Sequence, residues 1–346
     1  MEPQYLKTLS EVARFKVDGS NRLHSATHEE IRMGATTDIY FIKTYEILKS
    51  LGLENEPVVA EIFASRGGLL AGMPECISLL RGNGVDVEAL EEGEPFGPKE
   101  VIMRISGPYG DFGIYETALL GILASASAWA TAAGECKAAS GGRPFLSFGA
   151  RHVHPAVAPV MERAAIVGGA SGASDILGAR LMGQEPSGTM PHAVVLIVGD
   201  TIKVAREYDR IMPPDTKRIV LVDTFKDEAE ESLRVAGALG DRLEAVRLDT
   251  PGERGGVTAD LVREVRARLD QAGYRHVKIF VSGGVTPERM SVLAEAGADA
   301  FGIGSYISGA KPIDMTMDLK EINGRPIAKR GRIPGRTPNP KLRKVL

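Results

Sequence analysis

Residues 278–305 read KIFVSGGVTPERMSVLAEAGADAFGIGS, and this stretch decides the fold. It starts with an apolar run of strand length, turns at two glycines, continues as an amphipathic segment and ends in a second apolar run. The pattern predicts strands at Val277–Val281 and Ala300–Ile303, with a helix at Pro287–Ala296 between them. A strand, a helix and a further strand form a βα unit, which is the building block of parallel sheets.

The same rhythm extends through the second half of the chain. Further strands are predicted at Pro144–Phe148, Ala193–Val198, Arg218–Val222 and Ala245–Leu248, and further helices at Asp227–Leu239 and Ala259–Ala272. Their spacings, roughly 22 to 50 residues, are typical of βα units. Six or seven such units in series favour a barrel over an open doubly wound sheet. We therefore predict an α/β fold, an irregular parallel α/β barrel, over residues 141–310.

The first 140 residues have a different pattern, which predicts an N-terminal α+β domain. A helix is expected at Asp38–Leu51, and strands at Val58–Ala64 and Glu100–Ser106 on either side of a helix at Pro74–Asn83. Two long apolar helices are expected around Tyr115–Ala139. An uncharged stretch there, residues 117–134, could barely span a bilayer. Because it is rich in Ala, Ser and Gly, we predict a tightly packed core helix instead.

Composition limits the class of protein. The 346 residues carry a net charge of −3, so no strong field attracts nucleic acid or a membrane. The 40 glycines suit an α/β enzyme with many tight turns. Two cysteines, Cys76 and Cys136, cannot form a disulfide framework, which favours a reducing compartment. The amino-terminal stretch lacks an apolar segment, so we expect no signal peptide and a cytoplasmic location.

Residues 311–346 are predicted to form a C-terminal extension. Residues 322–327 resemble a hairpin that could add strands to the first domain. The last 18 residues hold seven Lys or Arg and no acid. We predict a solvated tail there, in preference to a phosphate-binding arm.

Polar residues and glycines follow the predicted strands, where barrel enzymes place their sites. They are Ser147–Arg151, Asp223–Thr224, Asp249–Thr250, Ser282–Gly284 and Gly304–Ser305. Glycine turns before a helix expose backbone N–H groups that bind phosphate. We therefore predict a phosphate site formed by Ser282, Gly283, Gly284, Gly302, Gly304 and Ser305. The alternative for these glycines is tight turns alone.

Three further groups are candidates for chemistry. Asp223 and Asp249, with Arg247, could hold Mg²⁺ through water or bind ribose hydroxyls, or could form a structural ion pair. His192 precedes a predicted strand and could be an ordinary core histidine. His152 and the nearby residue 154 form an H-x-H pair, which favours a cationic rim over a metal site because no further ligand is evident.

Six short motifs together resemble the nicotinate phosphoribosyltransferase family. They are Thr37-Asp38-Ile39-Tyr40, Ser147-Phe148-Gly149-Ala150-Arg151, Gly188-Thr189 with His192, Leu221-Val222-Asp223-Thr224, Arg247-Leu248-Asp249 and Ser282-Gly283-Gly284. The resemblance implies a type II phosphoribosyltransferase fold and a homodimer or larger oligomer with shared active sites. It also implies transfer of phosphoribose from phosphoribosyl pyrophosphate to nicotinate, with Mg²⁺ as cofactor, giving nicotinate mononucleotide and pyrophosphate in NAD salvage.

The resemblance also implies roles for single residues. Phe148 would stack on the pyridine ring, Tyr40 of the partner subunit would cover the other face, and Arg151 would hold the substrate anion. Ser174 falls where amide-using relatives carry Asp, although Asp175 is a second possible equivalent. His192 matches a histidine that ATP phosphorylates in some members, with Asp223 as its orienting partner, so ATP coupling is a further expectation.

The chain departs from the family after Asp249, where Thr250-Pro251-Gly252-Glu253 replaces Ser-Gly-Asp. The second acid is therefore displaced, and with it the metal or ribose contact that it makes in the family. Two alternatives remain for the whole chain. One is a phosphoribosyltransferase for quinolinate or another aromatic acid, which would need more cations around the ring than Arg151. The other is a non-catalytic barrel that binds a phosphorylated ligand.

Overall fold

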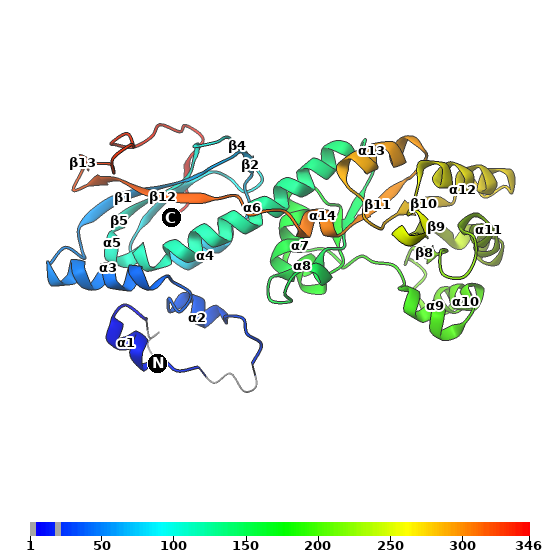
Figure 1. Cartoon of the computed structure of the whole chain (residues 1–346), viewed down its shortest axis with the longest axis horizontal. Coiled ribbons are helices and arrows are strands. Elements are labelled where there is room, and N and C mark those ends of the chain that lie inside the picture. Colours follow the sequence, from blue (N-terminus) through cyan, green and yellow to red (C-terminus); the bar gives the residue numbers. More distant parts are fainter. Residues whose placement is uncertain (1–4, 18–21) are drawn as a thin grey trace. The chain divides into compact units, whose positions relative to one another are not determined.

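The computed structural model describes residues 5–17 and 22–346, and it divides the chain into two compact units (Figure 1). Residues 1–4 of the stretch expected to lack a signal peptide lie outside the described part. The sheet unit comprises residues 1–131 and 311–346, and the barrel unit comprises residues 132–310. The chain therefore leaves the first unit once and returns to it.

The sheet unit is built on an antiparallel sheet with the strand order β13-β12-β1-β5-β3-β14. Its strands are β1 (Pro57–Ala64), β3 (Asp86–Ala89), β5 (Val101–Pro108), β12 (Met315–Ile322), β13 (Arg325–Pro326) and β14 (Arg343–Lys344). A second, small sheet pairs β2 (Gly68–Leu69) with β4 (Pro95–Phe96). The apolar sequence of β1 fits its central position, because seven of its eight residues are buried.

The helices of the sheet unit are α1 (Leu9–Arg14), α2 (His28–Arg32), α3 (Ile39–Ser50), α4 (Met73–Leu80), α5 (Tyr109–Phe112) and the start of α6 (Glu116–Ala139). The predicted pair of helices around Tyr115–Ala139 is wrong, because α6 is a single helix of 24 residues. Tyr109–Ala139 is apolar and long enough to cross a membrane, but half of its most apolar window is buried. Ser127 on α6 exchanges hydrogen bonds with the main chain of Ala71, as expected of a core helix.

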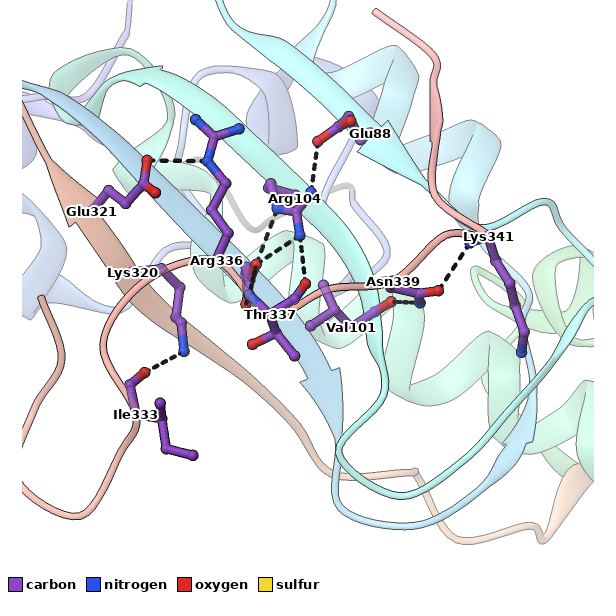
Figure 2. Close-up of polar contacts among 11 residues, drawn as sticks. Glu88, Val101, Arg104, Lys320, Glu321, Ile333, Arg336, Thr337, Asn339 and Lys341 are labelled. Carbon is purple, nitrogen blue, oxygen red and sulfur yellow. Dashed lines mark hydrogen bonds and ion pairs between the residues drawn. The ribbon is translucent and has the colours of Figure 1, made fainter. Parts of the chain in front are cut away.

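The basic C-terminal segment is not a free solvated tail, contrary to the prediction. Six of its seven cations pair with acids of the sheet unit: Lys329 and Arg332 with Asp318, Arg336 with Glu321, Lys341 with Glu100, Arg343 with Glu91, and Lys344 with Asp86. Figure 2 shows the segment crossing the sheet, where Arg104 donates to the carbonyl of Thr337 at 2.8 Å. The acids and carbonyls that hold the segment have no distinctive sequence signal, so the prediction missed these contacts.

The barrel unit contains a parallel sheet with the strand order β7-β6-β11-β10-β9-β8. Its strands are β6 (Phe145–Ser147), β7 (Gly172–Ala173), β8 (Arg218–Leu221), β9 (Leu243–Leu248), β10 (Lys278–Val281) and β11 (Ala300–Ile303). Its helices are α7 (Ala158–Val167), α8 (Ile176–Leu181), α9 (His192–Val198), α10 (Thr201–Ile211), α11 (Glu228–Leu239), α12 (Ala259–Gln271), α13 (Pro287–Glu295) and α14 (Ser305–Ser308). The α/β prediction is confirmed, in the form of a curled half-barrel that stays open between β7 and β8.

The predicted strand at Ala193–Val198 is wrong, because this run forms α9. A short continuous apolar run fits either a strand or a helix by pattern alone. Pro191 stands before the first turn, and Gly199 ends the helix with a φ of +79°, which a glycine adopts readily.

Candidate active site

A cavity of about 390 Å³ lies at the carboxyl ends of the barrel strands. It brings together eleven of the predicted site residues: Phe148, Arg151, Ser174, Arg247, Asp249, Ser282, Gly283, Gly284, Gly302, Gly304 and Ser305. Several other lining residues, among them Thr189 and Met190, had no predicted chemical role. Three predicted residues, Tyr40, His192 and Asp223, do not line this cavity.

Three side chains hold Arg247 at the carboxyl edge of the parallel sheet. Its Nε donates to Ser282 Oγ at 2.9 Å, Nη1 donates to Thr189 Oγ1 at 2.7 Å, and Nη2 donates to Asp249 Oδ2 at 2.9 Å. The Ser282 hydroxyl in turn donates to Asp249 Oδ1 at 2.8 Å. Arg247 and Asp249 therefore do form an ion pair, and the guanidinium is committed to holding Thr189 and Ser282 in place.

Phe148 lies against this network and depends on a glycine. The Arg247 guanidinium carbon is 5.6 Å from the centre of the Phe148 ring, a cation–π distance. A Cβ at Gly302 would lie 2.4 Å from Phe148 Cε2, which no real side chain tolerates. The absence of a side chain at Gly302 thus makes room for the aromatic ring, a role that the phosphate prediction did not include.

The loop of Gly283 and Gly284 has a backbone conformation that leaves N–H groups available to a ligand. Both residues have positive φ, +84° and +60°, which favours glycine. The Arg289 guanidinium donates to the carbonyls of Gly283 and Gly284 at 3.0 and 2.6 Å. Since the C=O and N–H of a trans peptide point in opposite directions, the N–H groups of the next residues point away from Arg289. The start of α13 is capped by Thr286, so the loop itself is the better candidate for binding an anion.

His192 and Asp223 form a separate pair. His192 Nε2 lies 2.9 Å from Asp223 Oδ2, and the Asp223 side chain is 1% exposed. Asp223 Oδ1 is buried without a hydrogen-bond partner among the described residues. Burial raises the pKa of the Asp223 carboxyl, while His192 opposes that shift.

Ser174 and its neighbour Asp175 have different environments. Ser174 lines the cavity, whereas Asp175 Oδ1 accepts a hydrogen bond from the Gly178 N–H at 2.6 Å and caps α8. The residue that lines the cavity at this point therefore carries a hydroxyl, and the neighbouring carboxylate caps the helix.

Two basic side chains, Arg151 and His152, line the cavity together with Phe148. Arg151 is exposed, and its Nε lies 3.4 Å from His152 Nε2. Burial and the Arg151 charge lower the pKa of His152, which keeps the imidazole neutral near pH 7. His154 accepts from the Ala156 N–H and does not line the cavity. Within residues 5–17 and 22–346, no group of three or more His, Cys, Asp or Glu is arranged to hold a metal.

One residue at the site escaped prediction altogether. Glu162 on α7 is fully buried and accepts hydrogen bonds from two loops of the cavity. The only sequence signal is an acid on the buried face of a helix whose other residues, apart from Arg163, are apolar. Tyr40 lies in the sheet unit at the start of α3, with 55% of its surface exposed.

A curled parallel sheet with glycine turns and an arginine–aspartate pair at its carboxyl edge, in one chain with an antiparallel sheet unit, defines a type II phosphoribosyltransferase fold. The chain belongs to the quinolinate phosphoribosyl transferase family. The model of that family's N-terminal domain matches residues 38–127, and the model of its C-terminal domain matches residues 129–318.

Individual relatives carry two kinds of name. The chain is similar to nicotinate-nucleotide pyrophosphorylase from Pyrococcus furiosus, with 46% identity, a TM-score of 0.87, and 91% of this chain and 82% of that chain covered. It is 32% identical over 247 residues to nicotinate phosphoribosyltransferase pncB2 of Mycobacterium tuberculosis, which covers 69% of this chain and 52% of that protein. Human nicotinic acid phosphoribosyltransferase, at 21% identity and a TM-score of 0.71 over 87% of this chain and 77% of that chain, shares the fold. The chain spans about half the length of the curated relatives it matches.

Proposed function

We propose that the protein transfers phosphoribose from phosphoribosyl pyrophosphate to nicotinate, forming nicotinate mononucleotide and pyrophosphate in NAD biosynthesis. One observation carries the proposal: a single cavity joins an aromatic ring, an exposed guanidinium and glycine loops that suit a phosphate. A pyridine ring would stack on Phe148, its carboxylate would pair with Arg151, and the 5′-phosphate would bind the loops at Gly283–Gly284 and Gly304–Ser305.

The number of available cations favours a substrate with one carboxylate. Quinolinate carries two carboxylates and would need at least two cations near the ring. Of the two arginines that line the cavity, Arg247 already donates to Thr189, Ser282 and Asp249, which leaves Arg151 as the guanidinium for the substrate. The depressed pKa of His152 argues against the imidazole as a second permanent charge.

The residue at position 174 favours an acid over an amide. A carboxylate facing the ring would repel nicotinate, whereas the Ser174 hydroxyl does not. Asp175, the other possible equivalent, is engaged in capping α8. Nicotinamide is therefore a poorer substrate in this proposal.

The reaction requires the chain to stabilise charge. As pyrophosphate leaves, the anomeric carbon becomes cationic and the departing group carries the negative charge. Asp249 lines the cavity, and Asp223 follows the neighbouring strand β8. Their carboxylates would hold ribose hydroxyls or the waters of Mg²⁺. The unpartnered Oδ1 of Asp223 fits a hard cation or its water. Bound Mg²⁺ would neutralise the pyrophosphate.

His192 fits the proposed coupling to ATP. A histidine that accepts a phosphoryl group needs one nitrogen free while the other is held. Asp223 holds Nε2, and 38% of the His192 side chain is exposed. The Nδ1 atom would then be the acceptor, and turnover of ATP would accompany synthesis.

A homodimer is part of the proposal. The exposed Tyr40 ring would cover the second face of the pyridine in a partner subunit, as the motif Thr37-Asp38-Ile39-Tyr40 implies. Exposure of an aromatic ring at a helix start is what a shared site would require of the isolated chain.

Quinolinate is the second candidate substrate. The matched family models are those of quinolinate phosphoribosyl transferase, and they extend over most of the chain. With quinolinate, the same transfer to the ring nitrogen would be followed by loss of the adjacent carboxylate as carbon dioxide.

The test is product formation from phosphoribosyl pyrophosphate and Mg²⁺ with nicotinate, quinolinate or nicotinamide supplied separately, each with and without ATP. Nicotinate mononucleotide from nicotinate without carbon dioxide release is the expected result. Product only from quinolinate, with carbon dioxide, would replace the proposal by its alternative. No product from any of the three would leave a phosphate-binding barrel without this activity.

A further inference from the structure

The Glu162 carboxylate is surrounded by hydrogen-bond donors from two loops. Oε1 accepts from Ser147 Oγ at 3.0 Å and from the N–H groups of Gly149 and Ala150 at 2.8 and 3.1 Å. Oε2 accepts from the N–H groups of Ser174 and Asp175 at 2.9 and 3.4 Å. Four of the five donors are backbone amides, which no side-chain substitution at those positions replaces.

The two loops are the ones that present the ring-binding residues. The first loop follows β6 and carries Phe148 and Arg151; the second follows β7 and carries Ser174. All three residues line the cavity, whereas Glu162 lies behind the loops and does not line it. Glu162 therefore contacts the supports of the ring-binding residues, and not the substrate.

Because Glu162 is buried, loss of its carboxylate would leave the five donors without an acceptor. Glu162 is 0% exposed, so no water replaces a lost acceptor. Burial raises the pKa of the Glu162 carboxyl, and the hydrogen-bond donors oppose that shift because they favour the ionised form, which accepts at every lone pair. The close approach is also fitted sterically, because a Cβ at Gly178 would lie 2.8 Å from Glu162 Cβ. The backbone of α8 can lie this near to α7 only at a glycine.

The phosphate end of the cavity has a different support. The Gly283–Gly284 loop is held by Arg289, and the Arg247–Asp249–Ser282 network spans β9 and β10. None of the hydrogen bonds to Glu162 reaches these residues. Loss of the Glu162 acceptor should thus disturb one end of the cavity and spare the other.

We infer that Glu162 is a positioning residue that fixes the two ring-binding loops and so determines recognition of the pyridine acid, but not of the phosphoribosyl donor. The inference rests on the proposed function for the identity of the ligands. The structural part, the tie between Glu162 and the two loops, stands independently of any substrate.

The first experiment measures the loops themselves. Backbone hydrogen exchange of the unliganded protein is compared for wild type, Glu162→Gln and Glu231→Gln. Glu231 is a matched control, because it is a buried acid on α11 of the same unit that pairs with Arg234. We expect roughly tenfold faster exchange or more at residues 149–151 and 174–175 in Glu162→Gln alone. Unchanged exchange in both segments, or equal acceleration across the whole barrel unit, would overturn the inference.

The second experiment measures recognition. In Glu162→Gln, KM for the pyridine acid is expected to rise roughly 10- to 100-fold, while KM for phosphoribosyl pyrophosphate changes less than about threefold. A merely structural role would lower the amount of active enzyme and leave both KM values unchanged. That outcome, or an equal rise in both KM values, would contradict the inference.

The two experiments separate this inference from the proposed function. If wild type turns over no pyridine acid, the function fails, while the exchange result still tests the positioning role. If Glu162→Gln does not fold, Glu162→Asp provides the measurement, because it keeps the charge but withdraws it by one methylene. Faster exchange in at least one of the two segments is then expected, and unchanged exchange in both would again overturn the inference.

Discussion

Nε2 of His192 lies 2.9 Å from Oδ2 of Asp223, whose second oxygen is buried with no partner in the described part of the chain. The pair joins a helix start to the loop after β8. One carboxylate thus orients an imidazole and keeps a free acceptor. This arrangement is expensive for a purely structural pair, because the unpartnered oxygen must be stripped of water.

The first prediction concerns this pair. Asp223→Asn keeps the shape but removes the charge that orients and stabilises the ring, so ATP-stimulated turnover should fall at least about tenfold. Burial raises the pKa of Asp223. As the pH is lowered, activity should therefore be lost at a pH above the ordinary pKa of an aspartate. Asp260→Asn, an exposed acid on α12, is the control. Unchanged activity of Asp223→Asn across the pH profile would refute the role of the pair.

A second prediction follows from the contact between Gly302 and Phe148. Gly302→Ala places a methyl group 2.4 Å from the ring and must displace it, so KM for the pyridine acid should rise roughly tenfold or more. Gly237→Ala on α11 meets only Tyr274 Oη at 3.6 Å and should be neutral or slightly stabilising. Steady-state kinetics on both variants make the comparison. Equal kinetics for Gly302→Ala and wild type would show that the ring position is unimportant.

Substrate preference between acid and amide depends on position 174. Ser174→Asp should lower kcat/KM for nicotinate by roughly 100-fold or more and reduce the discrimination against nicotinamide, because it adds a carboxylate to the lining of the cavity that holds the substrate anion. Asp175→Ala removes only the cap of α8 and should cost about 1 kcal/mol of stability without changing preference. If the preference between nicotinate and nicotinamide changes in Asp175→Ala but not in Ser174→Asp, residue 175 determines it and our account is wrong.

The fourth prediction concerns the ion pairs of the sheet unit. Arg104 donates to the buried Glu61. It also donates to the carbonyl of Thr337 in the C-terminal segment (Figure 2). Arg104→Ala leaves Glu61 buried without its cation and should cost about 3–5 kcal/mol of unfolding free energy. Arg343→Ala breaks an exposed pair with Glu91 and should cost less than about 1 kcal/mol. Urea unfolding of the two variants distinguishes them, and equal losses would contradict the assignment.

Stability should also depend on Glu116, at the start of α6. Burial, followed by the nearby Asp318, raises the pKa of Glu116 to about 7. The unfolded chain ionises near 4.5, so the native state is destabilised as pH rises from there through 7, by at most about 3 kcal/mol. Glu116→Gln should match wild type at pH 4 and be the more stable protein at pH 8. A difference of the same size at both pH values would exclude this titration.

Five of the six strands of the barrel unit could be predicted, because each is a short apolar run closely followed by a glycine or an acid. The sixth, β7, has only two residues, Gly172 and Ala173, and was not predicted. The positions of Asp249 and Ser282 at one edge followed from the same rule, since parallel strands share their carboxyl ends. The apolar run of α9 was wrongly predicted as a strand by the same rule. A continuous apolar run has no periodicity that separates a helix from a strand. Leu196 and Ile197 of this helix are exposed, so the apolar composition of the run did not indicate that its side chains are buried.

Glu162 and the basic C-terminal segment could not be predicted for a different reason. Their partners are backbone amides, carbonyls and acids brought near by tertiary folding, and a sequence does not reveal which backbone groups lack a partner. Asp175 illustrates the same limit at close range. Only the hydrogen bond to Gly178 distinguishes it from Ser174, the neighbour that faces the cavity.

The most direct test of the central claim is a competition between nicotinate and quinolinate at equal concentration, with phosphoribosyl pyrophosphate and Mg²⁺ in excess. The reaction of quinolinate is measured as labelled carbon dioxide, released from the carboxyl group that it loses. The reaction of nicotinate is measured as labelled mononucleotide. The account predicts a ratio of kcat/KM that favours nicotinate at least tenfold, since Arg151 is the guanidinium left for the substrate. A ratio that favours quinolinate would contradict it and would require a second cation at the ring.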